Sequence, residues 1–160
     1  MIIRPAKSRD ADAIAAVVIP VVREGATYAL DSDITEAVAV AYWTGPDREV
    51  FVAEDEGAVL GTHYLRANQA GGGRHVCNYG YMRAAAATGR GIARRMAEHS
   101  LEQARRREYW TMQFNFVVSA NERGVRLWRS LGFEEVGRLP EAFRHPVDGY
   151  VDELVMLRTL

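Results

Sequence analysis

Short segments in which apolar and polar residues alternate, or in which β-branched and aromatic residues gather between turn residues, predict the strands of this protein. They lie at residues 2–5, 49–53, 59–65, 75–82, 110–118, 134–139 and 150–157. Residues 54–57, Glu-Asp-Glu-Gly, predict a tight hairpin between the second and third of these segments. The three glycines at 71–73 predict a flexible loop before the fourth, and a Pro-containing loop is expected between the last two.

Four other segments repeat apolar residues every three or four positions, which predicts helices with one buried face. Their apolar positions are Ile14, Val17, Val18, Val21 and Val22; Ala37, Val38, Ala41 and Tyr42; Ile92, Met96, Ala97, Leu101 and Ala104; and Val125, Trp128 and Leu131. Ser8 or Asp10 can cap the first helix, and Pro20 is expected to kink or shorten it. The second stops near residues 45–46, and the third covers residues 91–106. Asn121 caps the fourth, which ends at Gly132.

The predicted order of elements is therefore β-α-α-β-β-β-α-β-α-β-β. The polar stretch at residues 24–32, between the first two helices, is expected to form a lid. With 160 residues, 48% of them hydrophobic, the chain fits one domain spanning residues 1–160.

Charge and cysteine content narrow the classes of function and the expected location. Lys and Arg total 20 against 21 for Asp and Glu, so the formal charge of -1 offers no general attraction for nucleic acid or an anionic membrane. The longest apolar runs fall far short of the roughly 20 residues that span a bilayer. Cys77 is alone and the N-terminus lacks a secretory pattern, so we expect a cytoplasmic protein. The four histidines, at positions 63, 75, 99 and 145, show no ligand spacing, and no metal is expected.

Residues 88–93, Thr-Gly-Arg-Gly-Ile-Ala, connect a predicted strand to a predicted helix. Gly89 and Gly91 leave the backbone accessible, and the first N–H groups of a helix can bind an anion at its positive end. Arg90 or Arg94 could add charge-assisted hydrogen bonds. The alternative is a tight turn in which the glycines serve only the backbone conformation. No G-x-x-x-x-G-K-[ST] motif occurs, and Arg94 replaces the last glycine of G-x-G-x-x-G, which argues against nucleotide hydrolysis and dinucleotide binding.

The loop at 88–93, the strand at 110–118 and the segment 121–133 together resemble the GCN5-related N-acetyltransferases, the GNAT family. The family's loop reads R/Q-x-x-G-x-G/A and its next helix N-x-x-A-x-x-L-Y-x-x-x-G-F; this chain departs from them at Thr88 and Trp128. The resemblance implies an α+β fold in three layers. Its mixed, mostly antiparallel seven-stranded sheet is flanked by about four helices, with the fourth and fifth strands splayed apart.

A more detailed resemblance covers about residues 75–139. Residues 75–81, His-Val-Cys-Asn-Tyr-Gly-Tyr, with residues 113–117, Gln-Phe-Asn-Phe-Val, and Asn121 are similar to the fungal N-acetyltransferases that modify proline analogues. Those enzymes place asparagines around the substrate and the thioester, and these match Asn78, Asn115 and Asn121. The likeness weakens before residue 50, where substrate contacts are expected, so the acceptor does not follow from it.

The resemblance implies acetyl-CoA as the cosubstrate and assigns the residues around it. The donor is expected to contact Tyr81, Met82, Arg83, Thr88, Gly89, Arg90, Gly91, Ile92, Ala93, Asn121 and Trp128. The acceptor is expected to contact Thr27, Tyr28, Asn78 and Asn115. The backbone of Tyr81 and Met82 would hold the pantetheine arm and polarise the thioester carbonyl.

The catalytic residues predicted from this resemblance are Asn115, Asn121 and Asn78. Asn115 would orient the amine. Many relatives have a tyrosine acid at the position of Trp128, whose indole cannot titrate, so Asn121 is expected to donate a hydrogen bond to the leaving thiolate instead. Water or a surface carboxylate such as Glu24 would act as the base, and the residues do not decide between them.

Several of these residues also have a simpler structural explanation. Asn121 is by default a helix N-cap, and the two roles can coexist. Trp128 is by default a core residue, and Thr27 and Tyr28 could equally be ordinary loop residues. Strand interiors disfavour asparagine, so Asn78 and Asn115 each require a polar partner.

Three functions are consistent with these observations. The first is acetylation of a small-molecule amine, such as an amino acid or a proline-like compound. The second is acetylation of a protein N-terminus or lysine, and the third is a non-catalytic acyl-CoA sensor that lost turnover when Trp128 replaced tyrosine. Dimers are common for this fold, so the resemblance also allows a homodimer.

Overall fold

The computed structural model describes all residues from 1 to 160. Its strands and helices follow the order predicted from the sequence. They are β1 (Ile2–Pro5), α1 (Ala11–Glu24), α2 (Glu36–Trp43), β2 (Glu49–Asp55), β3 (Ala58–Ala67), β4 (Val76–Arg83), α3 (Ile92–Arg106), β5 (Thr111–Val118), α4 (Glu122–Ser130), β6 (Glu134–His145) and β7 (Gly149–Thr159). Three short 3-10 turns lie before α1, between β3 and β4, and between β4 and α3.

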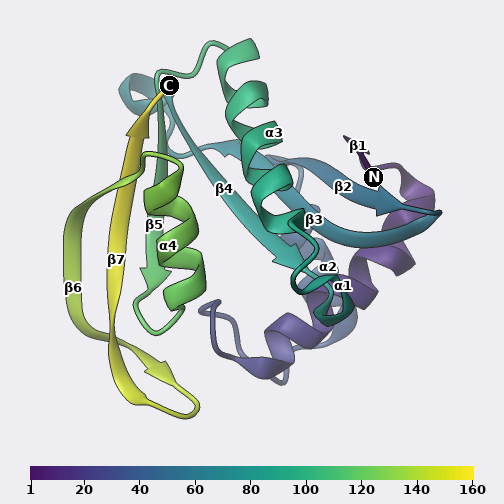
Figure 1. The fold of residues 1–160 in the computed structure, drawn as a ribbon, viewed down its shortest axis with the longest axis horizontal. Coiled ribbons are helices and arrows are strands. Elements are labelled where there is room, and N and C mark those ends of the chain that lie inside the picture. The colour runs from purple at the N-terminus through teal and green to yellow at the C-terminus, as the bar shows by residue number, and fades with distance from the viewer.

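The strands form one seven-stranded sheet in the order β1-β2-β3-β4-β5-β7-β6. All neighbours are antiparallel except β4 and β5, which are parallel. These two strands pair only at Val76 with Thr111 and at Cys77 with Met112, and then move apart along the rest of their length (Figure 1). The predicted mixed sheet with a splayed fourth and fifth strand is therefore confirmed.

Helices cover both faces of this sheet and complete the three layers. On one face, α1 and α2 bury a cluster that includes Val18, Trp43 and Tyr64. On the other, α3 and α4, in front of the sheet in Figure 1, pack on a cluster that includes Phe114 and Met156. None of the helices is long and apolar enough to cross a membrane.

The first two helices differ in detail from their prediction. Pro20 lies within α1 without shortening it, since α1 continues to Glu24. In α2, the buried residues are Ala39 and Trp43, whereas Val38 is 54% exposed. The sequence of α2 is apolar on every side, so its periodicity does not identify the buried face. The hydrogen bond from Trp43 Nε1 to Thr62 Oγ1, 3.0 Å long, orients this helix instead.

The loop predicted between the last two strands is mostly strand. β6 continues through Pro140 to His145, with a register shift between Leu139 and Phe143, and a short turn leads to Gly149. β6 is the edge of the sheet, where a proline costs no ladder hydrogen bond if its nitrogen faces away from the neighbouring strand. Pro140 thus did not mark the end of the strand, whereas the turn that follows contains Pro146 and is the predicted Pro-containing loop in shorter form.

Candidate active site

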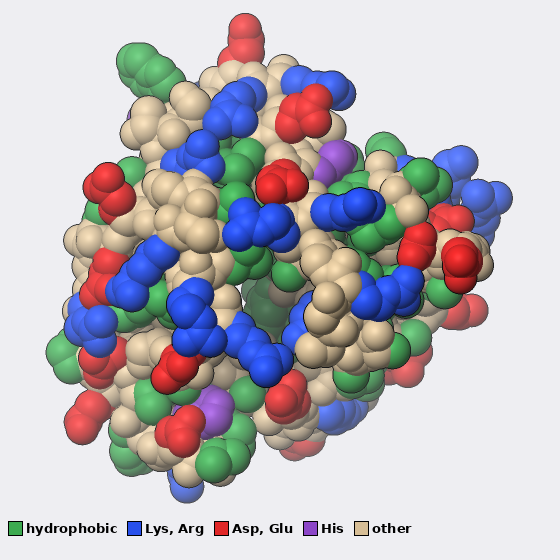
Figure 2. Space-filling model, in the orientation of Figure 1, with side chains coloured by type: hydrophobic (Ala, Val, Ile, Leu, Met, Phe, Trp, Pro, Cys, Tyr) green, Lys and Arg blue, Asp and Glu red, His purple; other side chains and the backbone are tan.

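A large cavity of about 810 Å³ opens between α1, the end of β4, the start of α3 and α4. Figure 2 shows a hollow near the centre of this face with Lys and Arg side chains around its mouth. The predicted donor-contact residues that line the cavity are Tyr81, Met82, Arg83, Thr88, Gly89, Gly91, Ile92, Ala93, Asn121 and Trp128. The one predicted donor contact that does not line it is Arg90, whose guanidinium instead pairs with Asp55.

The loop before α3 has the backbone form of an anion-binding turn. Gly89 and Gly91 have φ angles of 79° and 72°, which side chains adopt only under strain. A Cβ at either residue would meet no atom within 4 Å, so the space above the loop is open. The N–H groups of Gly89, Gly91, Ile92, Ala93 and Arg94 donate no hydrogen bond within the chain. Unpaired donors therefore gather at the positive end of α3.

Three arginines add positive charge to the large cavity. Arg83, Arg94 and Arg123 all line it. Arg94 also donates a 2.8 Å hydrogen bond to Ser130 Oγ, which ties the start of α3 to the end of α4. Arg123 was not predicted from the sequence, because only the packing of α4 against the mouth of the cavity places it there.

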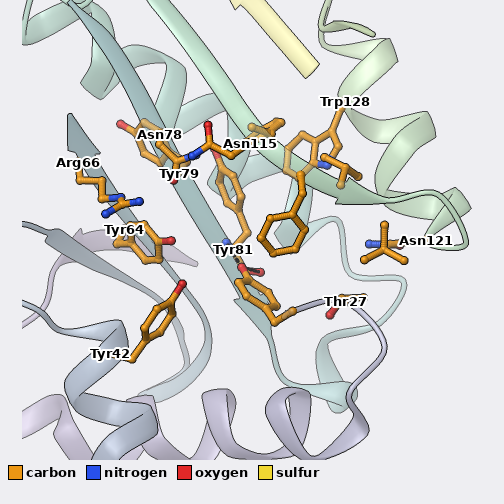
Figure 3. Close-up of a pocket in the computed structure, with 15 residues that line it drawn as sticks. Thr27, Tyr42, Tyr64, Arg66, Asn78, Tyr79, Tyr81, Asn115, Asn121 and Trp128 are labelled. Atoms are coloured by element: carbon orange, nitrogen blue, oxygen red, sulfur yellow. Dashed lines mark hydrogen bonds between the residues drawn. The ribbon is translucent and has the colours of Figure 1, made fainter. Parts of the chain in front are cut away.

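A second, smaller cavity of about 170 Å³ lies in the gap between β4 and β5. Aromatic side chains make up much of its wall, and every predicted acceptor contact lines it: Thr27, Tyr28, Asn78 and Asn115. The two cavities share Thr27, Tyr81, Asn121 and Trp128 as lining residues. Figure 3 shows Thr27 and Asn121 at one end of the small cavity and Arg66 and Tyr64 at the other.

Asn78 bridges the two strands where their backbones begin to part. Its side chain is buried, and Nδ2 donates a 2.9 Å hydrogen bond to the carbonyl oxygen of Gln113 on β5. This bond follows directly after the last backbone pair, Cys77 with Met112. The polar partner expected for an asparagine in an apolar strand is therefore present. This hydrogen bond joins β4 and β5 at the point where the gap between them begins.

Asn115 lies at the rim of the small cavity, on an irregular part of β5. The register with β7 shifts between Phe114 and Val117, and Asn115 is exposed. Its Nδ2 donates to Asn68 Oδ1 at 2.8 Å, and its Oδ1 accepts from Gln113 Nε2 at 3.1 Å. The side chain is thus held in place by two other amides.

Asn121 has the capping role predicted for it. Its Oδ1 accepts a 3.1 Å hydrogen bond from the N–H of Gly124, in the first turn of α4. The Nδ2 group makes no hydrogen bond within the chain and so keeps its two donors. A Cβ at position 124 would lie 2.6 Å from this Nδ2, so glycine leaves room for the amide.

Tyr28 reaches from the loop between α1 and α2 to the inner edge of β4. Its hydroxyl donates to the carbonyl oxygen of Tyr81 at 2.9 Å and accepts from the N–H of Tyr81 at 2.8 Å. Burial raises the pKa of this phenol well above its ordinary value, so it stays protonated. The N–H of Tyr81, which is expected to polarise the thioester, is therefore already paired with Tyr28. It can bind a thioester oxygen only if the Tyr28 hydroxyl moves away.

Trp128 lies against the aromatic core and both cavities at once. Its ring centroid is 4.9 Å from that of Tyr81 and 4.7 Å from that of Phe114. The hydroxyls of Tyr79 and Tyr81 contact Ser100 on α3, and burial raises the pKa of both phenols far above neutrality. These tyrosines therefore cannot ionise near neutral pH.

Neither cavity holds a histidine, and the small one holds no carboxylate. Glu24 lines the large cavity and is the only acidic residue in either wall. The cavity walls thus offer Glu24, or water, as a base for an incoming amine, and these are the two alternatives that the sequence left open.

The far end of the small cavity, formed by Tyr42, Tyr64 and Arg66, was not predicted from the sequence. Tyr64 is in register with Gly80 on β4, and a Cβ at Gly80 would overlap the Tyr64 ring. A glycine inside a strand marks such a close approach, so Gly80 was the available signal. Nothing local indicated Tyr42 or Arg66, because the contact between α2 and β3 brings them together.

Comparisons with known proteins agree with this geometry. The family model described as Acetyltransferase (GNAT) family matches residues 22–133. N-acetyltransferase aca1 of Schizosaccharomyces pombe is 31% identical over 111 residues, 69% of this chain and 53% of that protein. The chain thus spans about half the length of this curated relative.

Solved structures share the fold over almost the whole chain. A GCN5-related N-acetyltransferase from Kribbella flavida superposes with a TM-score of 0.93 at 40% identity, covering 99% of this chain and 97% of the other. A ribosomal-protein-alanine N-acetyltransferase from Brucella melitensis superposes with a TM-score of 0.87 at 26% identity, covering 100% of both chains. The family match, the splayed strands and the open turn before α3 lead to one conclusion: this chain belongs to the GNAT family of N-acetyltransferases.

Proposed function

We propose that this enzyme transfers the acetyl group of acetyl-CoA to the amine of a small molecule, such as an amino acid or a proline-like compound. The observation that carries the proposal is the junction of two cavities of different character. The large cavity has unpaired amides and arginines, and the small one is mostly aromatic. Thr27, Tyr81, Asn121 and Trp128 lie at the junction, where donor and acceptor would meet.

The large cavity fits the donor in both charge and backbone form. The free N–H groups of residues 89 and 91–94 suit a diphosphate, and Arg83, Arg94 and Arg123 supply countercharge. Acetyl-CoA supplies an acetyl thioester, whose carbonyl carbon accepts a nucleophile. Arg90 is not part of the proposed site, since it pairs with Asp55 outside the cavity.

The chain's own residues would orient the amine and stabilise the developing charge. A neutral amine attacks the carbonyl carbon; the new C–N bond forms, the C–S bond breaks, and the amine proton passes to water or Glu24. The two free donors of Asn121 Nδ2 could meet the departing sulfur. A hydrogen bond suffices there because a thiol has a reference pKa of about 8.5. Asn115, fixed by Asn68 and Gln113, would orient the amine.

The size of the small cavity favours a free small molecule over a polypeptide. At about 170 Å³ it is below the roughly 300 to 1,000 Å³ of typical drug-sized pockets. A protein acceptor would need an open groove for the residues that flank the target amine. Protein acetylation is the second candidate function, because the Brucella melitensis relative is named a ribosomal-protein-alanine N-acetyltransferase.

The test is a panel of amino acids, simple amines and peptides incubated with acetyl-CoA, with release of the CoA thiol as the readout. We expect thiol release with at least one small amine and much slower release with peptides that begin with the same residue. Faster turnover of the peptides would favour protein acetylation. Binding of acetyl-CoA without turnover of any acceptor would instead favour the acyl-CoA sensor.

A further inference from the structure

Two arginines stand at the end of the small cavity that is remote from the large one. Arg66 lines the cavity from β3, in register with Asn78 on β4. Arg48 does not line the cavity but packs on two tyrosines that do. Its Cζ is 4.1 Å from the ring centroid of Tyr42 and 4.4 Å from that of Tyr64. Figure 3 shows Arg66 beside Tyr64, on the side away from Thr27 and Asn121.

These guanidinium groups are short of partners. The Nε of Arg66 is buried without a hydrogen bond, as are Nε and Nη1 of Arg48. The Arg48 side chain is only 8% exposed. Asp47 is the single carboxylate near both: its Oδ2 accepts a long 3.3 Å bond from Arg66 Nη1, and its Oδ1 lies 3.7 Å from Arg48 Nε. Two cations thus share one anion that is itself 58% exposed.

The Tyr42 and Tyr64 rings face the Arg48 guanidinium, but no tyrosine here carries a negative charge that would neutralise the arginines. Burial raises the pKa of Tyr64 to about 12, so its phenol is neutral at pH 7. No carboxylate lines the small cavity. Arg48 is nearly fully buried and Arg66 is 30% exposed. Guanidinium nitrogen atoms that are removed from water without full hydrogen bonding are costly, and their place beside a cavity points to a ligand that completes them. One uncompensated positive charge, in a space of about 170 Å³, matches one monovalent anionic group on a small molecule.

We propose that Arg66 binds a carboxylate of the acceptor, so that the substrate is an amine that also carries a carboxylate, an amino or imino acid. The carboxylate lies at Arg66, and the amine, on the carbon next to it, points along the cavity toward Tyr81 and Asn121. Arg48 supports the charge from behind the tyrosine rings. This inference rests on the proposed function and adds to it the chemical class of the acceptor.

The experiment compares acids with their amides in the wild type and in Arg66→Gln. Matched pairs are proline with prolinamide, alanine with alaninamide, and methionine with methioninamide, each measured by thiol release. We expect the wild type to prefer the acid, and the ratio of kcat/KM for acid over amide to fall about 10- to 100-fold in Arg66→Gln, mainly through a higher KM for the acid. Comparing this ratio between the two proteins cancels the difference in amine basicity within each pair. Arg66→Lys, which keeps the charge, should recover part of the ratio.

Two further variants separate ligand binding from a structural role. Asp47→Asn removes the anion that competes for Arg66, so we expect a lower KM for the acid; a structural ion pair would instead make this variant resemble Arg66→Gln. Arg144→Gln, at an exposed arginine with no ion pair, is the matched control. Equal use of acids and amides by the wild type, or an unchanged ratio in Arg66→Gln, overturns the inference and leaves the proposed function standing. Failure of every small amine overturns both.

Discussion

Tyr28 is a single side chain that completes the hydrogen bonding of an otherwise unpaired backbone. Beyond Cys77, β4 has no backbone partner on the side of β5, and at Tyr81 a phenol takes the place of the missing strand. Burying a peptide group without a partner costs more than the net energy of one hydrogen bond. The position of the loop between α1 and α2 is therefore coupled to the inner edge of the sheet.

Tyr28→Phe removes only the hydroxyl and leaves the N–H and carbonyl of Tyr81 unpaired. We expect the free energy of unfolding, measured by urea denaturation, to fall by about 1–3 kcal/mol. Tyr150→Phe, at a residue that is 68% exposed, is the matched control and should have no measurable effect. If the urea midpoint of Tyr28→Phe equalled that of the wild type, water would replace the hydrogen bonds of the phenol to Tyr81 without loss of stability.

Asn115 tests the proposed chemistry at the scale of one residue. Because its amide is fixed at the rim of the small cavity and lies outside the large one, its loss should affect the acceptor and spare the donor. We expect Asn115→Ala to lower kcat at least about ten-fold while the affinity for CoA, measured by calorimetry, hardly changes. Unchanged turnover would remove Asn115 from the chemistry.

At the scale of elements, the turn before α3 combines backbone strain with open space. Both glycines need positive φ angles, so Gly89→Ala and Gly91→Ala should each destabilise the fold by about 1–2 kcal/mol. Both glycines line the large cavity, and a methyl group added at either would meet no protein atom within 4 Å, so it would take up open space beside the proposed diphosphate site. We therefore expect weaker binding of CoA in calorimetry for both variants.

Gly57→Ala is a stringent control for this prediction. Gly57 has a φ of 81° in the turn between β2 and β3, and a Cβ there would also meet no atom within 4 Å. The substitution should cost similar stability and leave CoA affinity unchanged. If all three variants bound CoA equally well, the glycines would serve the turn alone.

The order and type of the elements were predictable because each depends on local pattern. The β-forming run at residues 59–65 and the Asn121 cap of α4 are signals within single segments, and the structure confirms both. The burial of α2 was not predictable, since a helix apolar on every side can bury any face and a contact with Thr62 decides which. The same limit applies to the candidate site. Its donor side follows one loop, whereas Tyr42 and Arg66 meet only through packing between distant segments.

At the scale of the whole molecule, a buried histidine should link stability to pH. His63 is fully buried between aromatic rings, and burial, together with nearby His99, lowers its pKa to about 3. The folded state therefore keeps this imidazole neutral, whereas the unfolded chain takes up a proton below its ordinary pKa of 6.5. The free energy of unfolding therefore has its full value above pH 6.5 as far as His63 is concerned, and it decreases as the pH falls toward 3.

We expect the free energy of unfolding to decrease with a slope of up to about 1.4 kcal/mol per pH unit from this residue, between roughly pH 6 and 3. His63→Gln should flatten the curve in this range, and His75→Gln, at an exposed histidine, should not. The measurement is urea denaturation at a series of pH values. Identical slopes in the wild type and His63→Gln would contradict the assignment.

The gap between β4 and β5 also gives the sheet an edge in its interior. Unpaired strand edges recruit strands from other chains, and proteins usually protect them with charge, proline or a covering segment. Here the covering segment is the loop that carries Tyr28, with the aromatic wall of the small cavity beside it. A variant that displaces this loop should therefore expose the inner edge of β4 and aggregate more readily than the wild type.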